Sequence, residues 1–326
     1  MGRKREPWRN SNRNQNQFVV LNKRSVDVTI LTDARYTGSQ PKDDYTSNVY
    51  LEDQLVQDAL ETIGLRTQRV AWSDKSYDWT NTEYALFRST WDYFDRFDEF
   101  LPWIEKASQE TKFINPNQLI HWNLDKAYLE DLRQKGINTI PTVYCRKGSN
   151  ENLISIANIK KWKDLVIKPR VSGAAMDTHY LPCNQIEEHQ VLFKNLVDKQ
   201  DMMVQEAQNF ILDKGEVSIV MIGDQYSHAV LKVAKEGDFR VQDDFGGSVH
   251  DYNPTQAEIA FAQDVITACS TQPLYARVDI IRDNKDDISL VELELIEPEL
   301  WFRKKPQAAK ALASQIAAHI KEKALS

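Results

Sequence analysis

The hydrophobic pattern in the first third of the chain switches between short apolar runs and helical spacing. The apolar, β-branched and aromatic runs typical of strands lie at residues 26–31, 68–72, 84–88 and 112–115. Between them, residues 50–63 carry apolar side chains at helical spacing up to Gly64, and residues 97–104 show the same period. Strand–helix alternation of this kind predicts a small parallel α/β sheet.

The pattern changes after Asn115-Pro116, where a helix is predicted over residues 124–135 and ends at Gly136. Further helices are expected near residues 155–161, 185–196, 254–268 and 306–323. Pro254 and Pro306 suit the first turns of the last two helices. Strands are expected at residues 143–145, 165–168, 202–205, 217–220 and 227–233.

The most informative pattern comes late in the chain. Two apolar runs, at residues 277–281 and 291–294, flank the turn-like stretch 283–287. This arrangement predicts a β-hairpin.

Charged side chains follow one face of that hairpin. A turn centred near residues 285–286 places Asp279 opposite Glu292, and Arg277 across from Glu294. Three carboxylates on one face repel one another unless something positive lies between them. A hard cation such as Mg²⁺ binds oxygen ligands of this kind. A solvated acidic hairpin is the alternative interpretation.

Composition indicates a soluble globular protein. The chain has 326 residues, 41% hydrophobic and 27% charged, enough for two or three packed subdomains. The sequence has neither a bilayer-spanning apolar run nor a signal peptide pattern, so we expect no membrane partner and a cytoplasmic location. Cys145, Cys183 and Cys269 are scattered without metal-ligand spacing, which indicates a reducing compartment.

Charge is distributed unevenly along the chain. Residues 1–25 hold seven basic side chains against Glu6 alone, a net charge of +6, which leaves −13 on the remainder of a chain of net charge −7. This polar, Asn-rich head predicts a disordered basic tail. A solvated tail is favoured over a nucleic-acid-binding arm, and the acidic body argues against nucleic acid as the main partner.

Two predicted strand ends in the first part carry arginines. Ligands of parallel α/β sheets bind beyond the carboxyl ends of the strands. Arg35 follows the first strand, and Arg88 ends the third, with Asp92 in the turn beyond it. These three are candidate substrate residues, with the arginines holding an anionic group. Ordinary turn chemistry around residues 90–92 is the alternative.

A second group of candidates suits phosphate. Lys168 ends an apolar strand and precedes a loop of small residues that includes Ser172 and Gly173. Its ammonium and the bare backbone N–H groups of the loop could hold phosphate oxygens. Lys126, on the helix predicted after Asn115-Pro116, is an equally weak candidate when taken alone. For either lysine alone, a solvated side chain is the simpler interpretation.

A third group lies in the last part of the chain. Gln205-Glu206 ends an apolar strand and suits the edge of adenine, while Glu216, ten residues on, suits ribose hydroxyls; a polar strand end is the alternative. Lys232 and Arg240 flank a tight turn and could brace a transferring phosphoryl group. Gly246-Gly247 would let the backbone approach a substrate closely.

Other nucleotide and metal motifs are missing from the sequence. It has no G-x-x-x-x-G-K-[ST], G-x-G-x-x-G, H-E-x-x-H or paired C-x-x-C. The six histidines are isolated. P-loop and Rossmann chemistry are therefore not supported.

The order of these features resembles the ATP-grasp superfamily, near prokaryotic glutathione synthetase, over roughly residues 115–305. The run 88–93, the run 276–279 and Glu294-Leu295-Ile296-Glu297-Pro298 look most like the cyclo-ligases of cycloserine biosynthesis and their uncharacterised relatives. The resemblance implies an α+β ATP-grasp fold with the nucleotide between two sheets. It also implies an N-terminal α/β domain (26–115), a lid subdomain (116–200) and a C-terminal subdomain with the metal site (201–326).

The resemblance also implies roles for the candidate residues. Lys126 and Lys168, with Ser172 and Gly173, would bind the ATP phosphates. Gln205 and Glu206 would bind adenine, and Glu216 the ribose. Asp279, Glu292 and Glu294 would hold two Mg²⁺ ions. The residues expected to face the phosphoryl group and the acceptor are Lys232, Arg240 and Arg277.

Three positions depart from the family pattern. The third metal position is commonly Asn and is Glu294 here, with Arg277 across the hairpin to offset its charge. Ser218 stands where many members have a basic residue, and Gln242 where many have Asn. These departures affect the expected substrate contacts more than the nucleotide site.

The implied reaction activates a small, amino-acid-like carboxylate as an acyl phosphate, with ADP leaving. An amine or aminooxy-type nucleophile then attacks, from a second molecule or within the same one, while a lid at residues 140–200 excludes water. A small-molecule kinase and a non-catalytic ATP-binding regulatory module are the alternatives. The second is disfavoured because binding alone would not need three carboxylates and two basic residues. Many relatives are dimers, so a homodimer is one expectation.

Overall fold

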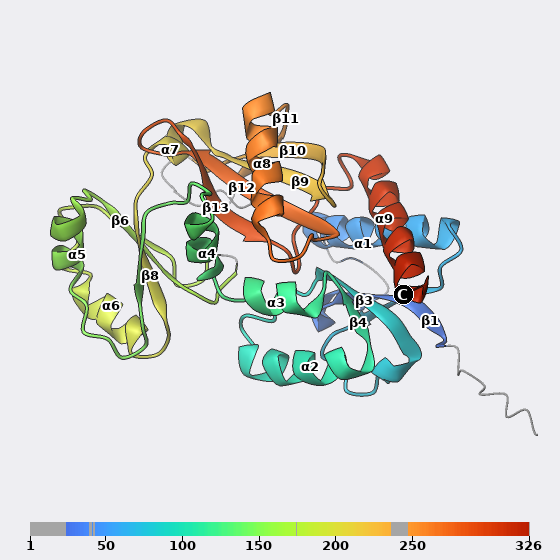
Figure 1. The fold of residues 1–326 in the computed structure, drawn as a ribbon. Coiled ribbons are helices and arrows are strands. Elements are labelled where there is room, and N and C mark those ends of the chain that lie inside the picture. The colour runs from blue at the N-terminus through green and yellow to red at the C-terminus, as the bar shows by residue number, and fades with distance from the viewer. Residues whose placement is uncertain (1–23, 39–40, 42, 174, 236–246, 326) are drawn as a thin grey trace, which may run out of the picture.

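Three β-sheets meet in this computed structural model, which describes residues 24–38, 41, 43–173, 175–235 and 247–325 (Figure 1). The tail predicted at residues 1–25 lies outside the described residues except for Arg24 and Ser25. Arg240 and Gly246, two of the candidate site residues, also lie outside them.

The first sheet is parallel, with strand order β2-β1-β3-β4, as the alternating pattern predicted. Its strands are β1 (Val26–Thr32), β2 (Thr67–Ala71), β3 (Thr82–Ser89) and β4 (Lys112–Ile114). The intervening helices are α1 (Asp44–Thr62) and α2 (Phe97–Glu110), with the 3-10 turns η1 (Ala34–Tyr36) and η2 (Trp79–Asn81). α1 begins where Asp43 and Thr46 form a capping box.

The second sheet is a small antiparallel one, with strand order β5-β8-β6-β7. Its strands are β5 (Thr142–Cys145), β6 (Leu165–Pro169), β7 (His179–Leu181) and β8 (Met202–Glu206). Helices α5 (Leu153–Lys160) and α6 (Gln190–Val197) share an apolar core with it. β7 was not predicted, because three residues are too few to show a period.

The helix predicted over residues 124–135 is shorter than expected. Helix α3 (Asn117–Asn123) ends first, and α4 (Tyr128–Gln134) begins only after a turn. Asp125 causes the break, because its carboxylate accepts from the Ala127 N–H at 2.9 Å and pairs with Arg170 at 2.6 Å. Lys126 therefore lies in the turn before α4, not on a helix as predicted.

The third sheet is antiparallel, with strand order β11-β10-β9-β12-β13. Its strands are β9 (Glu216–Ile222), β10 (Gln225–Val233), β11 (Ser248–Tyr252), β12 (Tyr275–Arg282) and β13 (Ile288–Glu294). Helices α7 (Phe210–Lys214), α8 (Gln256–Ala268) and α9 (Pro306–Leu325) belong to the same part of the chain. β11 and α7 were not predicted; β11 is a largely exposed edge strand without a run of buried apolar residues.

The first and third sheets share one apolar core. Leu60 of α1 and Leu312 of α9 are both fully buried in it, and the two helices lie side by side in Figure 1. The Tyr275 hydroxyl donates to the Ile296 carbonyl at 2.7 Å, and Asn115 donates to the Leu295 carbonyl at 2.8 Å. These contacts fix the loop after β13 against the N-terminal sheet.

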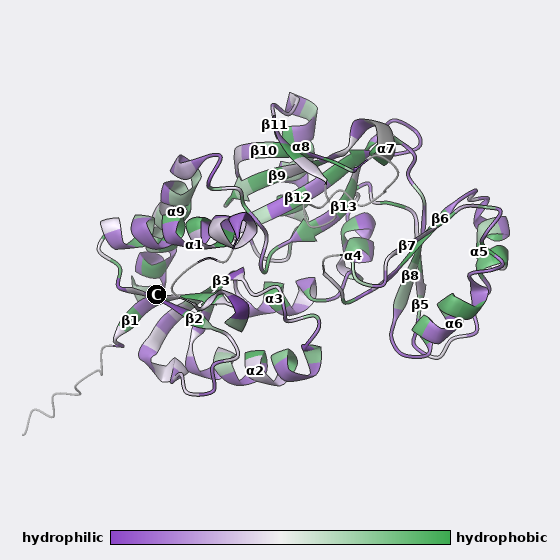
Figure 2. Ribbon diagram, turned by 180° about the vertical axis from the view of Figure 1, so that it is seen from behind, coloured by the Kyte–Doolittle hydropathy of each residue, from purple (hydrophilic) through white to green (hydrophobic). Residues whose placement is uncertain are grey.

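Surface helices of the protein carry one apolar and one polar face. In Figure 2, α2 and α6 show bands of both colours, as expected for helices packed on a sheet. Among the described residues, no helix is both long enough and apolar enough to cross a membrane.

A buried histidine makes the stability of this fold dependent on pH. The neutral ring of His228 donates from Nε2 to the Leu300 carbonyl at 2.8 Å. Burial lowers the pKa of His228 from 6.5 to about 4; Lys305 adds to the shift, and Asp251 opposes it. Between these two pKa values only the unfolded chain takes up the proton, so acid favours unfolding.

We therefore expect His228 to remove about 2 kcal/mol of unfolding free energy between pH 7.5 and pH 5. Urea denaturation of the wild type and of His228→Gln at both pH values measures this share. Equal losses in the two proteins would contradict it.

Candidate active site

The β12–β13 hairpin has the predicted register. Asp279 pairs with Glu292, and Arg277 pairs with Glu294 across the two strands. The Arg277 guanidinium contacts the Asp279 carboxylate at 2.8 Å and also forms an ion pair with Glu294. Arg277 thus lies between two of the three carboxylates, as the sequence predicted.

A second cation reaches Asp279 from the neighbouring strands. Lys232 on β10 lies 3.2 Å from Asp279 and pairs with Glu216 on β9, its partner in the strand register. Ser218 donates to Asp279 at 2.6 Å, so this departure from the family pattern supplies a neutral hydrogen-bond donor. Glu216 is therefore the counter-ion of Lys232 as well as the predicted ribose residue.

The two upstream lysines approach the same hairpin, Lys126 from the turn before α4 and Lys168 from β6 of the small sheet. The Lys126 ammonium lies 3.2 Å from Glu292 and donates to the Ser172 carbonyl. Lys168 is 9% exposed, and within the described part of the chain its ammonium makes neither a hydrogen bond nor an ion pair. Burial, with Lys126 adding, lowers the pKa of Lys168, although Glu292 opposes the shift. An unpaired buried ammonium is costly unless a ligand neutralises it.

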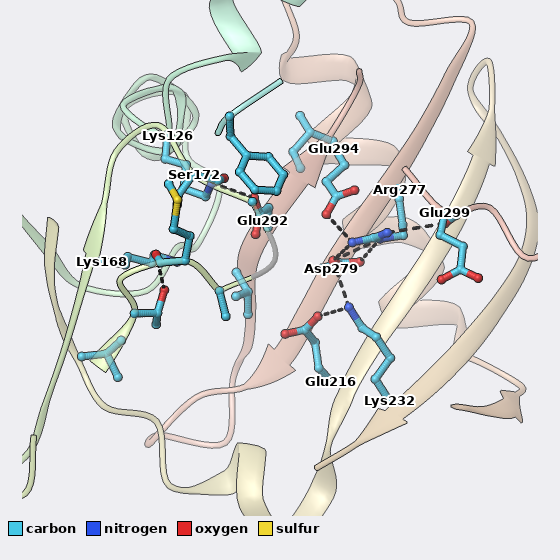
Figure 3. Close-up of a pocket in the computed structure, with 18 of the residues that line it drawn as sticks. Lys126, Lys168, Ser172, Glu216, Lys232, Arg277, Asp279, Glu292, Glu294 and Glu299 are labelled. Carbon is cyan, nitrogen blue, oxygen red and sulfur yellow. Dashed lines mark hydrogen bonds and ion pairs between the residues drawn. The ribbon is translucent and has the colours of Figure 1, made fainter. Parts of the chain in front are cut away.

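All these groups line one cavity of about 1060 Å³ where the three sheets meet. Figure 3 shows Lys126 and Lys168 on one side of Glu292, and Arg277, Asp279, Lys232 and Glu216 on the other. The predicted site residues in the lining are Arg35, Lys126, Lys168, Ser172, Gly173, Gln205, Glu206, Glu216, Lys232, Arg277, Asp279, Glu292 and Glu294.

Three predicted substrate residues do not line the cavity. Arg88 is buried and donates to the Pro298 carbonyl at 3.1 Å. Asp92 accepts from the Trp72 indole at 2.6 Å and pairs with Arg96 at 2.8 Å. Gly247 precedes β11 outside the lining. For Arg88 and Asp92 the structure therefore corrects the prediction, because both side chains are used in packing and hydrogen bonding.

Gly173 has a packing reason for being glycine. A Cβ atom placed there would come within 2.4 Å of the Phe94 ring. The small-residue loop of the second sheet thus packs directly against the N-terminal domain. Any side chain at Gly173 would push the two apart.

The charges of the cavity do not balance among themselves. Although burial opposes ionisation, Arg277 and Lys232 hold the pKa of Asp279 below its usual range. Burial raises the pKa of Glu294 to about 7 despite Arg277, and raises that of Glu297 to about 8 with Glu294 adding to the shift. The described residues therefore supply too little positive charge to keep both Glu294 and Glu297 ionised at neutral pH, and Lys168 forms no ion pair with any of them.

These residues fit Mg²⁺ and a polyphosphate. The described residues contain no preformed group of three or more metal-binding side chains, because Arg277 and Lys126 hold the carboxylates. The buried carboxylates of the hairpin suit a hard cation that takes oxygen ligands. The Lys168 ammonium suits phosphate oxygens. Both needs are met in a single cavity.

Several residues of the cavity were not identified from the sequence. They are the carboxylates Asp95, Glu297 and Glu299 and the aromatic residues Tyr36, Tyr45, Trp91, Tyr93 and Phe94. Glu297 lies in the run 294–298, whose resemblance to the family could have marked it as a site residue. The aromatic residues come from distant segments and show no local pattern.

The fold and this site define an ATP-grasp protein, and comparisons with known proteins agree. The profile of the RimK-like ATP-grasp domain matches residues 129–317, and that of the D-cycloserine synthetase DcsG N-terminal domain matches residues 28–115. The chain belongs to the RimK-like ATP-grasp family.

Individual relatives support the same assignment. The cycloserine biosynthesis protein DcsG of Streptomyces lavendulae is 27% identical over 279 residues, covering 81% of this chain and 92% of that protein. The crystal structure of D-cycloserine synthetase DcsG is similar with a TM-score of 0.79 and 25% identity, over 90% of this chain and 99% of that one.

A more distant relative shows the fold alone. D-alanyl-alanine synthetase A from Vibrio cholerae O1 biovar eltor has a TM-score of 0.62 at 13% identity, over 90% of this chain and 98% of that one. The predicted ATP-grasp fold is confirmed. The chain is an ADP-forming carboxylate–amine ligase that uses ATP.

Proposed function

We propose that the cavity binds Mg²⁺-ATP between the second and third sheets and activates a small, amino-acid-like carboxylate for attack by an amine-type nucleophile. The observation that carries this proposal is the convergence of two lysines, one in the turn before α4 and one on β6, with the acidic hairpin. Lys126 reaches Glu292, and the unpaired Lys168 lines the same cavity. These residues are far apart in sequence, so their meeting needs the whole fold.

Different residues would hold the phosphates and the adenine of the nucleotide. Lys126, Lys168, Ser172 and Gly173 would hold the phosphates, and Gln205 would meet the adenine edge with its amide. Gln205 is already oriented, because its amide donates to the Thr142 hydroxyl at 2.9 Å. Glu206 would share the adenine contact.

The acidic hairpin and its cations would serve the reacting groups. When bound, Mg²⁺-ATP supplies the phosphoryl group and the charge that activate the carboxylate. Asp279, Glu292 and Glu294 would hold two Mg²⁺ ions. Asp279 positions Lys232 and Arg277 through ion pairs. These two cations would neutralise negative charge on the transferring phosphoryl group and on the acceptor. Glu216 would hold the ribose.

The proposal also includes Arg240 and Gly246, two predicted site residues that lie outside the described residues. Arg240 would assist Lys232, and Gly246 would lie near the acceptor. Arg35 lines the cavity, but its side chain is paired with Asp33 at 2.7 Å. An anionic substrate would compete with Asp33 for that guanidinium.

Substrate class, assembly and location also belong to the proposal. The names of the relatives, cycloserine and D-alanyl-alanine synthetases, support amino-acid-like substrates and leave both intramolecular and intermolecular ligation open. The domain limits 26–115, 116–200 and 201–326 also belong to the proposal, although β8 (Met202–Glu206) pairs within the second sheet and so lies beyond residue 200. We propose a cytoplasmic protein, in keeping with three free cysteines, and a homodimer.

Incubation of the purified protein with ATP, Mg²⁺ and a pool of amino acids tests the proposal. We expect ADP, inorganic phosphate and an amide product, detected by coupled assay and mass spectrometry. A phosphorylated product without free phosphate would indicate the kinase alternative. Absence of ADP with every carboxylate–amine pair would contradict the proposal.

A further inference from the structure

The cavity extends past the acidic hairpin to an aromatic end at the N-terminal domain. Trp91 contacts Tyr36 and Tyr45, with ring centroids 6.0 and 6.4 Å apart, and Trp301 lines the same cavity. None of the residues proposed for the nucleotide belongs to this group. The aromatic end is therefore space for the other substrate.

The Glu297 carboxylate at this end forms no ion pair with any described residue. The other buried or half-buried acids around the hairpin have ion-pair partners; these acids are Glu216, Asp279, Glu292, Glu294 and Glu299. Across the described ranges, Glu297 forms no ion pair, although it lines the cavity. A half-buried carboxylate in apolar surroundings is stabilised by a cation that enters with a ligand.

The backbone of this segment is held from both domains. The Glu297 carbonyl accepts from the Trp91 indole at 2.9 Å, and the Pro298 carbonyl accepts from Arg88 at 3.1 Å. The Glu299 carbonyl accepts from Arg277 at 3.5 Å, and its side chain pairs with Arg303. The backbone on which Glu297 stands is thus fixed, and the charge of the nearby Glu299 is already paired with Arg303.

We infer that Glu297 anchors a protonated amino group of the substrate at the aromatic end of the cavity. The inference rests on the proposed function, because it assigns to the substrate the part of the cavity that the nucleotide would leave free. The Trp91 indole, which donates to the Glu297 carbonyl, would offer its ring face to that cation, whereas the Trp301 ring already faces the Arg277 guanidinium at 5.3 Å. The substrate class is therefore a small carboxylate that also carries an ammonium group.

Paired probes that differ only at the amino group test this assignment. With the protein saturated by Mg²⁺ and AMPPNP, calorimetry compares D-alanine with D-lactate, D-serine with D-glycerate, and D-cycloserine with its N-acetyl derivative. We expect the amino member of at least one pair to bind about tenfold more tightly. Glu297→Gln removes the preference and leaves AMPPNP affinity unchanged. Asp95→Asn, which neutralises an exposed acid of the same lining, keeps the preference.

Three results would overturn the assignment. The first is a preference for the amino member that survives in Glu297→Gln. The second is a loss of AMPPNP or Mn²⁺ affinity in that variant, which would make Glu297 a metal ligand. The third is an absence of preference in every pair although AMPPNP binds. If AMPPNP itself does not bind the wild type, the proposed function fails instead.

Discussion

Asp279→Asn and Glu292→Gln are each expected to lower kcat for ADP formation by about a thousandfold or more, equivalent to about 4 kcal/mol in the barrier. Both changes keep the size of the side chain and remove one negative charge from the proposed metal site. The hairpin register places these two side chains directly opposite each other, so each variant disrupts the same site.

The Asp279 variant has a stability cost of its own, because Arg277 and Lys232 both pair with that carboxylate. Activity is therefore measured well below the melting temperature found by calorimetry. Glu258→Gln is the matched control, since Glu258 is a buried carboxylate that caps α8 outside the cavity lining. It should lose stability and keep kcat. Wild-type kcat in either hairpin variant would refute the metal assignment.

Lys168→Met is expected to change nucleotide affinity and stability in opposite directions. The Lys168 ammonium is buried and has no hydrogen-bond or ion-pair partner among the described residues, so its removal takes away a desolvation cost and raises the melting temperature of the nucleotide-free protein. The same change removes a phosphate contact and weakens AMPPNP binding about tenfold or more.

Lys126→Met is the comparison for this experiment. Lys126 already pairs with Glu292, so its loss should weaken AMPPNP binding and also lower the melting temperature. Calorimetric titration and thermal unfolding of both variants give the two quantities. Unchanged AMPPNP affinity in Lys168→Met would count against the phosphate role, and a lower melting temperature would show that the ammonium has a structural partner.

The sequence predicted features that depend on local pattern. The alternation of strands and helices gave the parallel sheet, and the spacing of residues 277–294 gave the hairpin register with Arg277 facing Glu294. The break before α4 was missed because Asp125 accepts a local hydrogen bond from the Ala127 N–H and pairs with Arg170, which is distant in sequence. A pattern of apolar positions carries no sign of such a pairing.

The substrate end of the cavity was the least predictable part. Arg88 stands at a strand end, as a ligand-binding residue would, yet its guanidinium donates to the Pro298 carbonyl more than two hundred residues away. Glu297 was not selected, because what distinguishes it is that it forms no ion pair with any described residue, whereas its charged neighbours do. Such a property depends on tertiary structure, and no spacing within the sequence encodes it.

The central claim is that Lys126 before α4, Lys168 on the second sheet and the acidic hairpin of the third sheet hold one magnesium-nucleotide. A crystal structure with AMPPNP and Mn²⁺ tests it most directly, because anomalous scattering locates the metal. The account predicts manganese at about 2.1 Å from carboxylate oxygens of Asp279, Glu292 and Glu294, with phosphate oxygens on Lys126 and Lys168. Nucleotide bound elsewhere, or metal without contact to these carboxylates, would contradict it.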